Sequence, residues 1–300
     1  MADRAERIES GFITKGSLMK AYEILIRELG QFEMAATFAF VMAFTLKEIE
    51  VDEWLPRLTD VQVDGANWMM NFRLAERRRD FSGWFCSEAF ELVRDCGRHE
   101  IGCHGFRHLP LAENITQKRD AAYELQSAST LAKVKGIELK TFVFPRNQVG
   151  YLEELVHQGY IGFRNIHPAV GRYGRLGNIL REFHIREKAQ NSEPASYGMV
   201  SIPGGYFLNW RHGLRKRVPE AVTLLRWRSI LENAVRFDQV ALLFLHPHNL
   251  IDGHDMARLF RGVLRIAAEL RDSRGLSILT QQQFCKKRAL IFNPLTESVP

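Results

Sequence analysis

The sequence predicts a single α/β domain built on a mostly parallel sheet, and three observations support this prediction. Apolar segments of strand length alternate with amphipathic segments of helix length, which is the pattern of βα units. About seven such strands can be counted, and parallel neighbours need a crossover helix between them. The 300 residues contain no linker rich in Pro, Gly or Ser. We therefore expect one domain over residues 1–300, folded as an α/β barrel or as a doubly wound sheet.

The N-terminal half begins with a helix over residues 17–29, where apolar residues recur at helical spacing and Gly30 ends the pattern. The first strand follows at residues 35–41 (AATFAFV), which are apolar and of strand length. Residues 44–82 lack a regular period, so we expect a long excursion from the domain there and no second domain. The elements expected next are a helix at 87–98, a short strand at 100–103, a helix at 116–135 and a strand at 141–144.

The C-terminal half continues the alternation and contains the most apolar strand of the chain, expected at residues 240–245. Its other expected elements are a helix at 151–158, strands at 160–164 and 199–202, helices at 220–236 and 255–273, and a last strand at 276–279. In both candidate folds the ligand site lies at the carboxyl ends of the strands. Catalytic and binding residues are therefore expected directly after strands.

Composition and charge exclude several classes of protein. The 41 basic and 35 acidic residues give a net charge of +6, and the basic residues are scattered, which is unfavourable for nucleic-acid binding. The most apolar stretch, residues 34–46, is shorter than the roughly 20 residues that span a bilayer. The charged first ten residues lack the apolar core of a secretory signal, so we expect a cytoplasmic protein. The four cysteines form no CxxC pair, which argues against a structural zinc site.

Two histidines follow the strand expected at residues 100–103. His104 and His108 are four residues apart, so one helical turn would place both on the same face, close enough to share a metal. The alternative is a pair of loop histidines that bond to backbone carbonyls. The position at the end of a strand favours the metal pair.

A second histidine cluster follows the strand expected at residues 240–245. His246 is followed by Pro247, which stiffens the backbone, and then by His248 and Asn249. A histidine titrates near neutral pH, so His246 is suited to act as a general acid or base. The alternative is a loop histidine without a catalytic role.

A third polar cluster, Pro145, Arg146 and Asn147, follows the strand expected at residues 141–144. Arg146 is suited to hold an anion or a carboxylate, although ordinary turn chemistry explains the same residues equally well. Three strand ends thus lead into polar loops, two of them with histidines, and this joint pattern is more informative than any one of them.

Four segments that occur in a fixed order resemble the motifs of the polysaccharide deacetylases with a NodB-like domain, and more closely a branch associated with surface-polysaccharide biosynthesis. The resemblance covers residues 16–283. HEIGCHGFRH (residues 99–108) resembles the metal-binding motif, and ATFAFV (36–41) resembles a strand that precedes that motif. FVFPRNQVGYL (142–152) resembles the third motif in the form found in that branch, and LHPHN (245–249) resembles the last motif.

This resemblance implies a distorted (β/α)7 barrel and a metal-dependent hydrolase that removes an N-acetyl group from a sugar. By the resemblance, His104 and His108 bind a divalent metal, usually zinc, and His246 protonates the departing amine. The metal polarises the acetamide carbonyl and lowers the pKa of its water to about 7. The substrate would be an N-acetylated sugar or its nucleotide-linked or lipid-linked precursor. We expect the substrate-binding residues to be Pro145, Arg146, Asn147, Trp210, His248 and Asn249.

Trp210 and the basic residues 211–217 have both functional and structural explanations. Trp210 comes after the turn Gly204-Gly205, and an aromatic ring there suits stacking on a sugar, although such aromatics also build cores. Residues 211–217 are suited to meet the diphosphate of a sugar precursor or an anionic membrane surface, or else form a solvated loop.

The sequence departs from the family at its first motif. Family members carry an apolar strand ahead of the first helix, and that strand ends in aspartates that serve as base and as third metal ligand. Before residue 17 this chain has only a lone Asp3 and no apolar run, so we expect the barrel to lack its first strand. The alternatives are therefore a non-catalytic sugar-binding member of the fold and, less favoured, an amidase or esterase that acts on non-sugar substrates.

Overall fold

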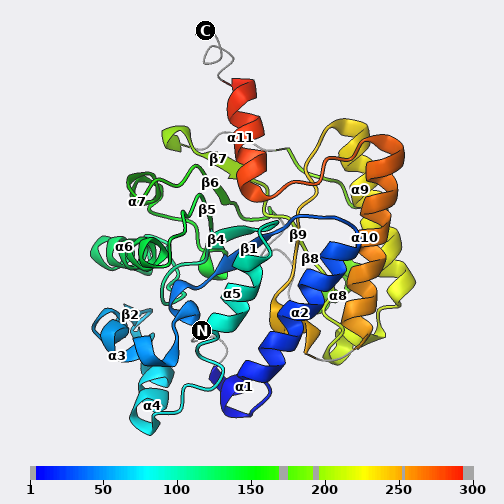
Figure 1. Ribbon diagram of the computed structural model, residues 1–300. Coiled ribbons are helices and arrows are strands. Elements are labelled where there is room, and N and C mark those ends of the chain that lie inside the picture. Colours follow the sequence, from blue (N-terminus) through cyan, green and yellow to red (C-terminus); the bar gives the residue numbers. More distant parts are fainter. Residues whose placement is uncertain (1–4, 169–174, 192–195, 252–253, 293–300) are drawn as a thin grey trace.

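A computed structural model describes residues 5–168, 175–191, 196–251 and 254–292 (Figure 1). It confirms an α/β fold with a central sheet of five parallel strands in the order β1-β4-β5-β6-β7. These strands are β1 (Thr37–Phe40), β4 (Glu100–Cys103), β5 (Thr141–Val143), β6 (Gly162–Arg164) and β7 (Val200–Ile202). Each lies within or overlaps a segment that the sequence predicts as a strand, so the alternation of apolar and amphipathic segments locates the central sheet correctly.

A second, two-stranded sheet continues the first. Its strands, β8 (Tyr206–Phe207) and β9 (Leu243–Phe244), are parallel. Residues 203–205 alone separate β7 from β8, so one bent strand takes part in both sheets. Gly205 allows the bend because it has a φ of +69° and a Cβ there would collide with Leu242. The segment β7–β8 thus joins the two sheets along the chain, while the hydrogen-bonded strand pairs form two separate sheets.

Helices cover one face of this sheet on the side of β1. The helices α2 (Lys15–Gln31) and α5 (Ser87–Asp95) pack against Phe38 and Phe40 of β1, and the ring of Tyr22 stacks 5.7 Å from that of Phe40. The remaining long helices are α6 (Lys118–Val134), α9 (Glu220–Phe237), α10 (His254–Arg274) and α11 (Gln281–Phe292). Shorter ones are α1 (Ala5–Glu9), α3 (Val51–Trp54), α7 (Leu152–His157) and α8 (Arg175–Glu182). In Figure 1, α6 and α7 lie on one side of the sheet and α9 and α10 on the other.

The opposite face of the sheet, here called the inner face, carries Glu100 and His104 on β4 and its continuation. Side chains alternate along a strand, so these two lie on the same face and Cys103 lies on the other. Thr141 shares the inner face because its hydroxyl donates to Glu100. The register then places Arg164 on the inner face as well, since Thr141 pairs with Gly162 and Val143 pairs with Arg164.

The helix α11 docks on the inner face at the amino-terminal ends of the strands. The carboxylate of Glu100 accepts from the hydroxyl of Thr37 (2.6 Å) and from the backbone N–H of Gln282 (2.8 Å) in the first turn of α11. A carboxylate at this position satisfies a donor that a helix start leaves unpaired. Glu100 therefore anchors α11 at the end of the sheet that lies opposite the histidines.

This helix overturns one expectation from the sequence. Residues 276–279 form no strand, and the chain enters α11 instead. Thr280 and Gln283 start that helix, because each side chain bonds the backbone N–H of the other. Leu276 and Ile278 pack against the core, Leu279 is exposed, and the segment has no strand partner among the described residues.

The strand predicted over residues 240–245 is shorter than expected. Only Leu243–Phe244 forms the strand β9, and all side chains from 240 to 245 are partly exposed. Within the described ranges β9 has one parallel neighbour, β8, and β1 likewise pairs with β4 alone. A strand with one free edge has fewer hydrogen bonds to neighbouring strands and no strand beside that edge. This explains why β9 is short and why the side chains from 240 to 245 are partly exposed.

The excursion at residues 44–82 forms small elements of its own. It holds the two-residue strands β2 (Gln62–Val63) and β3 (Ala66–Asn67) and the helix α4 (Met70–Arg78). Gly65, with a φ of +76°, makes the turn between the strands. Trp54, Trp68 and Phe72 of the excursion are buried in the main hydrophobic core.

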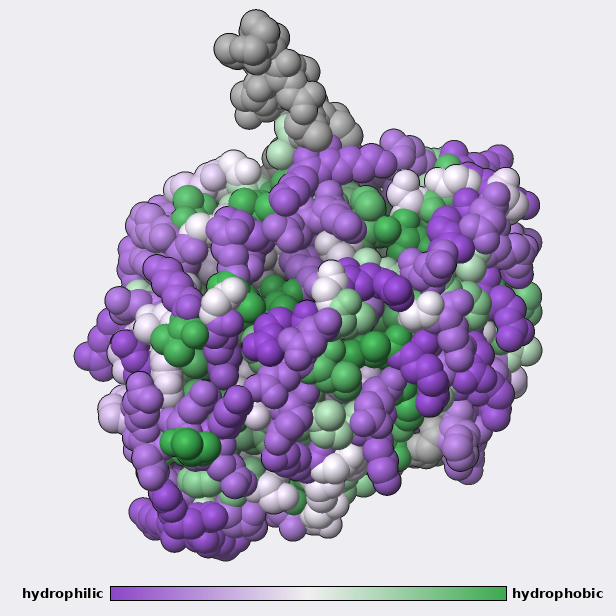
Figure 2. All heavy atoms as spheres, viewed as in Figure 1, coloured by the Kyte–Doolittle hydropathy of each residue, from purple (hydrophilic) through white to green (hydrophobic). Residues whose placement is uncertain are grey.

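On the face drawn in Figure 2, hydrophilic side chains cover most of the surface and hydrophobic ones lie in separate patches. None of the helices that the structure describes has the length and apolar composition needed to cross a membrane.

Candidate functional site

The site begins with His104 and His108, whose rings approach each other directly after β4. Their Nε2 atoms are 3.0 Å apart and the ring centroids 4.6 Å apart. Both side chains are partly exposed, so solvent reaches them. The spacing of four residues thus brings the two imidazoles together as the sequence predicts, although the loop between them is not helical and His108 has a φ of +62°.

A backbone carbonyl orients the ring of His104. Its Nδ1 lies 2.6 Å from the carbonyl oxygen of Val143 on β5, and a carbonyl accepts only, so Nδ1 carries the proton. The Nε2 of neutral His104 is then an unprotonated acceptor that faces His108. Metal-binding histidines commonly donate their other N–H to a carbonyl in this way, which fixes the tautomer that binds.

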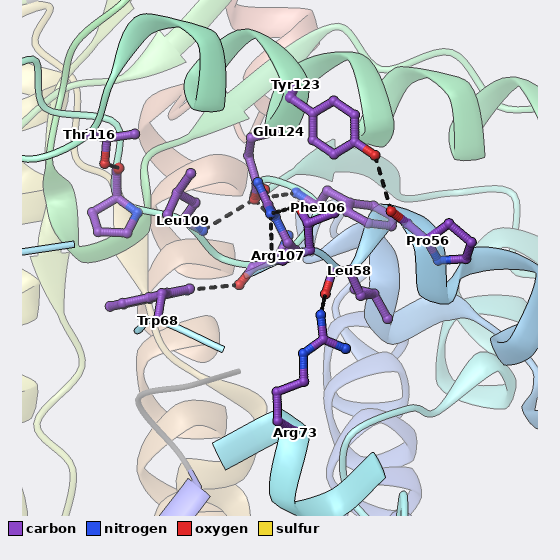
Figure 3. Close-up of polar contacts among 12 residues, drawn as sticks. Pro56, Leu58, Trp68, Arg73, Phe106, Arg107, Leu109, Thr116, Tyr123 and Glu124 are labelled. Carbon is purple, nitrogen blue, oxygen red and sulfur yellow. Dashed lines mark hydrogen bonds and ion pairs between the residues drawn. The ribbon is translucent and has the colours of Figure 1, made fainter. Parts of the chain in front are cut away.

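The loop between the two histidines wraps around one buried carboxylate, that of Glu124 on α6 (Figure 3). One Glu124 oxygen accepts from the backbone N–H groups of Phe106 (2.7 Å), Arg107 (2.6 Å) and Leu109 (3.2 Å). The other accepts from Nε of Arg107 at 2.9 Å, and both side chains are almost fully buried. Gly105 is required here, because its φ is +80° and a Cβ would press against the same carboxylate. Glu124 therefore fixes the loop that presents His108.

The excursion contributes an aromatic wall to the site. The indole of Trp68 stacks on the imidazole of His108 with centroids 6.5 Å apart, and its Nε1 donates to the carbonyl of Arg107 at 3.3 Å. The guanidinium of Arg146 lies 4.5 Å above the same indole. Arg146 is exposed and has a φ of +54°, so an unusual backbone conformation directs a cation toward the neighbourhood of the histidine pair.

The last predicted motif follows β9 and forms a tight turn. Asn249 Oδ1 accepts from the backbone N–H of His246 at 2.8 Å, and the backbone carbonyl of His246 accepts from the N–H of Asn249 at 2.8 Å. His246 is partly exposed, whereas His248 and Asn249 are buried. His248 stacks on His246 with centroids 5.2 Å apart. Asn249 and His248 thus support the ring of His246 from within the protein.

Trp210 extends the site toward the start of the chain. Its ring meets His248 edge to face at 5.7 Å and stacks on His212 at 4.6 Å. The guanidinium of Arg7, on α1, lies 4.3 Å above it. The short helix α1, which the sequence analysis did not predict, therefore reaches the loop that follows β8, while Glu6 and Glu9 on it are exposed.

Arg164 connects the third and last motifs on the inner face. Its Nη2 donates to Oδ1 of Asn147 at 2.6 Å, and its guanidinium lies 4.4 Å above the ring of Phe244 on β9. Phe244 and His246 are two residues apart and share a face of β9. Val143, whose carbonyl binds His104, is the register partner of Arg164. The three predicted strand ends therefore surround one region at the carboxyl ends of the strands.

The histidine pair fits two ligands of a divalent metal. Two nitrogens that each lie about 2.0–2.1 Å from a tetrahedral zinc are about 3.3 Å apart, close to the 3.0 Å seen here. The tautomer of His104 also suits binding through Nε2. A catalytic zinc usually has three protein ligands, and the described part of the chain holds no group of three His, Cys, Asp or Glu placed to bind one. The residues described thus supply two ligands.

Two other polar regions are less suited to be the site. A groove of about 480 Å³ between α2 and α10 is lined by Arg27, Arg258 and Arg261, but each of these pairs with a carboxylate. A buried network around Glu182 and Arg226 also pairs charges of both signs. In both regions the named arginines thus pair with the protein's own carboxylates.

Comparison with known proteins does not identify the chain. No protein-family model and no curated protein matches it.

Sequence reasoning missed three residues that shape the site. Trp68 lies in an irregular stretch where no sequence pattern distinguishes it from a core residue. Glu124 did offer one, because it is a charge within the apolar stripe formed by Ala121, Leu125 and Ala128 on α6. Arg164 offered another, as a cation at the end of an otherwise apolar strand.

Proposed function

We propose that this chain is a divalent-metal-dependent hydrolase that removes an N-acetyl group from a sugar or sugar precursor, of the polysaccharide deacetylase type. The observation that carries the proposal is the convergence of the Nε2 atoms of His104 and His108, with His104 oriented by the Val143 carbonyl. Zinc is the expected metal because neutral imidazoles are among its preferred ligands. Cobalt would take the same ligands.

The finer architecture belongs to the same proposal. The segment β7–β8, which runs from the five-stranded sheet into the sheet that contains β9, supports a distorted (β/α)7-type barrel that is open between β9 and β1. Interior-facing side chains at this opening, among them Ala39, Val41 and Phe244, are partly exposed, as an open barrel would have them. Within the residues described β1 has no second strand neighbour, and this supports the proposal of a barrel without the family's first strand.

The residues around the histidine pair have distinct roles in this reaction. A metal held by His104 and His108 would polarise the acetamide carbonyl and supply a nucleophilic water near neutral pH. His246 protonates the amine nitrogen as the C–N bond breaks, because an amine leaves poorly unless it is protonated. Arg146 and Trp68 bind and orient the sugar, the ring of Trp68 through stacking and Arg146 through its cation. Trp210 supplies a second aromatic surface.

The proposal is tested by acetate release from N-acetylhexosamine oligomers and from nucleotide-linked N-acetylhexosamine. We expect release that requires added zinc or cobalt and that falls to background in His104→Ala. His157→Ala is the matched control, since His157 is an exposed histidine on α7, and it should retain full activity. Zinc-loaded protein that releases no acetate from either substrate would contradict the proposal.

One observation favours a second candidate, a sugar-binding protein of the same fold without turnover. This observation is that the described residues supply two metal ligands and no carboxylate beside them. Such a protein would bind N-acetylated sugars through Trp68 and Trp210 while acetate stays at background with zinc present. Binding without release is therefore the outcome that separates it from the hydrolase.

A further inference from the structure

Arg164 is a cation on the inner face of the sheet that has no carboxylate partner among the residues described. Its only hydrogen bond to them runs from Nη2 to the neutral amide oxygen of Asn147 at 2.6 Å. Its Nε is buried and contacts no acceptor in the described ranges. Other buried arginines have a carboxylate partner: Arg107 and Arg226, for example, each pair with a buried glutamate. Arg164 is thus a cation whose counter-ion the described chain does not supply.

Burying such a charge costs free energy unless an anion accompanies it. The cost is visible in the pKa of the Arg164 guanidinium, which burial lowers from 12.5 to about 10. The group nevertheless remains charged at neutral pH. A sequence selected for stability alone would place an apolar residue at this position of β6, and exceptions of this kind are typical of binding sites.

Part of the Arg164 side chain reaches solvent, although its Nε does not. Arg164 is partly exposed, and so are Phe207, Phe244 and His246 on the strands opposite it. The ring of Phe244 lies 4.4 Å from the guanidinium and provides an aromatic surface against which the cation packs. Asn147 accepts one N–H of Nη2 and Nε is buried, so Nη1 and the second N–H of Nη2 remain available to a planar anion.

We propose that Arg164, together with Asn147 and Phe244, forms a carboxylate-binding site on the inner face, below the histidine pair. A guanidinium and a carboxylate are both planar and can form two parallel N–H···O bonds. The single positive charge of Arg164 also balances the single negative charge of a carboxylate better than the larger charge of a phosphate. Two sources have this chemistry: acetate, which is the product of the proposed hydrolysis, and a sugar that carries a carboxylate. The site itself does not depend on the hydrolase proposal.

The test uses the full chain stripped of metal with a chelator, so that turnover and metal binding play no part. Titration with [13C]acetate and with glucuronate, followed by NMR, should show saturable binding at pH 7 with one site per chain. Arg164→Gln should weaken binding at least tenfold, and Arg164→Lys should weaken it less, because it keeps the charge and loses the fork. Arg119→Gln removes an exposed arginine on α6 and should bind as the wild type does.

The outcomes separate the sources and the alternatives. Acetate binding alone would assign the site to a small carboxylate, and binding of both probes would include sugar acids. No saturable binding to a folded wild-type chain, undiminished binding to Arg164→Gln, or tighter binding of inorganic phosphate than of acetate would each overturn the inference. Circular dichroism on each variant shows that it is folded. Failure of the hydrolase proposal leaves these results unaffected, because no metal is present.

Discussion

Glu124→Gln is expected to lower the free energy of unfolding by about 3–5 kcal/mol, the usual cost of removing one partner of a buried ion pair. The carboxylate accepts three backbone N–H groups and Nε of Arg107, all from the loop that carries the two histidines. An amide in its place must turn its NH2 group toward one set of these donors. Urea denaturation followed by circular dichroism measures the change.

Glu138→Gln is the matched control for that substitution. Glu138 is exposed and pairs with the surface residue Lys140, so its loss should change the free energy of unfolding by less than about 1 kcal/mol. The folded Glu124→Gln variant, measured below its unfolding temperature, should also bind zinc more weakly, because its loop no longer holds His108 beside His104. Equal stability and equal zinc affinity in the two variants would show that Glu124 does not position the loop.

His246→Ala is expected to reduce acetate release about 10²–10⁴-fold while zinc binding is unchanged. The size of the loss is that of a general acid, since the amine must then leave without a positioned proton donor. The retained zinc distinguishes this variant from His104→Ala, which is expected to lose both zinc binding and acetate release. Steady-state acetate release and metal content, measured on the same preparation, give both readings.

His248→Phe is the companion to that experiment. His248 is buried and stacks on His246, so a planar ring of similar size preserves the packing and removes the imidazole nitrogens. We expect a smaller loss of activity than in His246→Ala. If His246→Ala released acetate at the wild-type rate, or if His248→Phe were the more damaged variant, the proton donor would not be His246.

The sequence predicts the central sheet because its signal is local. Each of the five parallel strands is a short apolar run between amphipathic helices, and such runs are recognisable without tertiary information. The last element was predicted wrongly for the same reason: residues 276–279 are apolar enough for a strand, but strand formation needs a neighbour, and α11 takes its place against Glu100. Whether an apolar run becomes a strand is decided by distant residues.

The candidate site was predictable only in part. The histidines are named correctly as a converging pair because their spacing is short and follows a strand. Their support is not local: Val143 orients His104 from another strand, Glu124 holds the loop from a helix, and Trp68 arrives from the excursion. Contacts between residues so far apart in sequence leave no pattern in one chain, apart from a charge such as Glu124 in an apolar stripe.

The most direct test of the account is a calorimetric titration of zinc into the chelator-treated full chain. The account predicts one zinc per chain in the wild type and in the exposed-histidine variant His157→Ala, and no zinc binding above background in the double variant His104→Ala/His108→Ala. On binding, the proton on Nε2 of His108 that faces Nε2 of His104 must leave or move to Nδ1, because the metal takes that nitrogen. A wild-type chain that takes up no zinc, or a double variant that binds it equally well, would contradict the central claim.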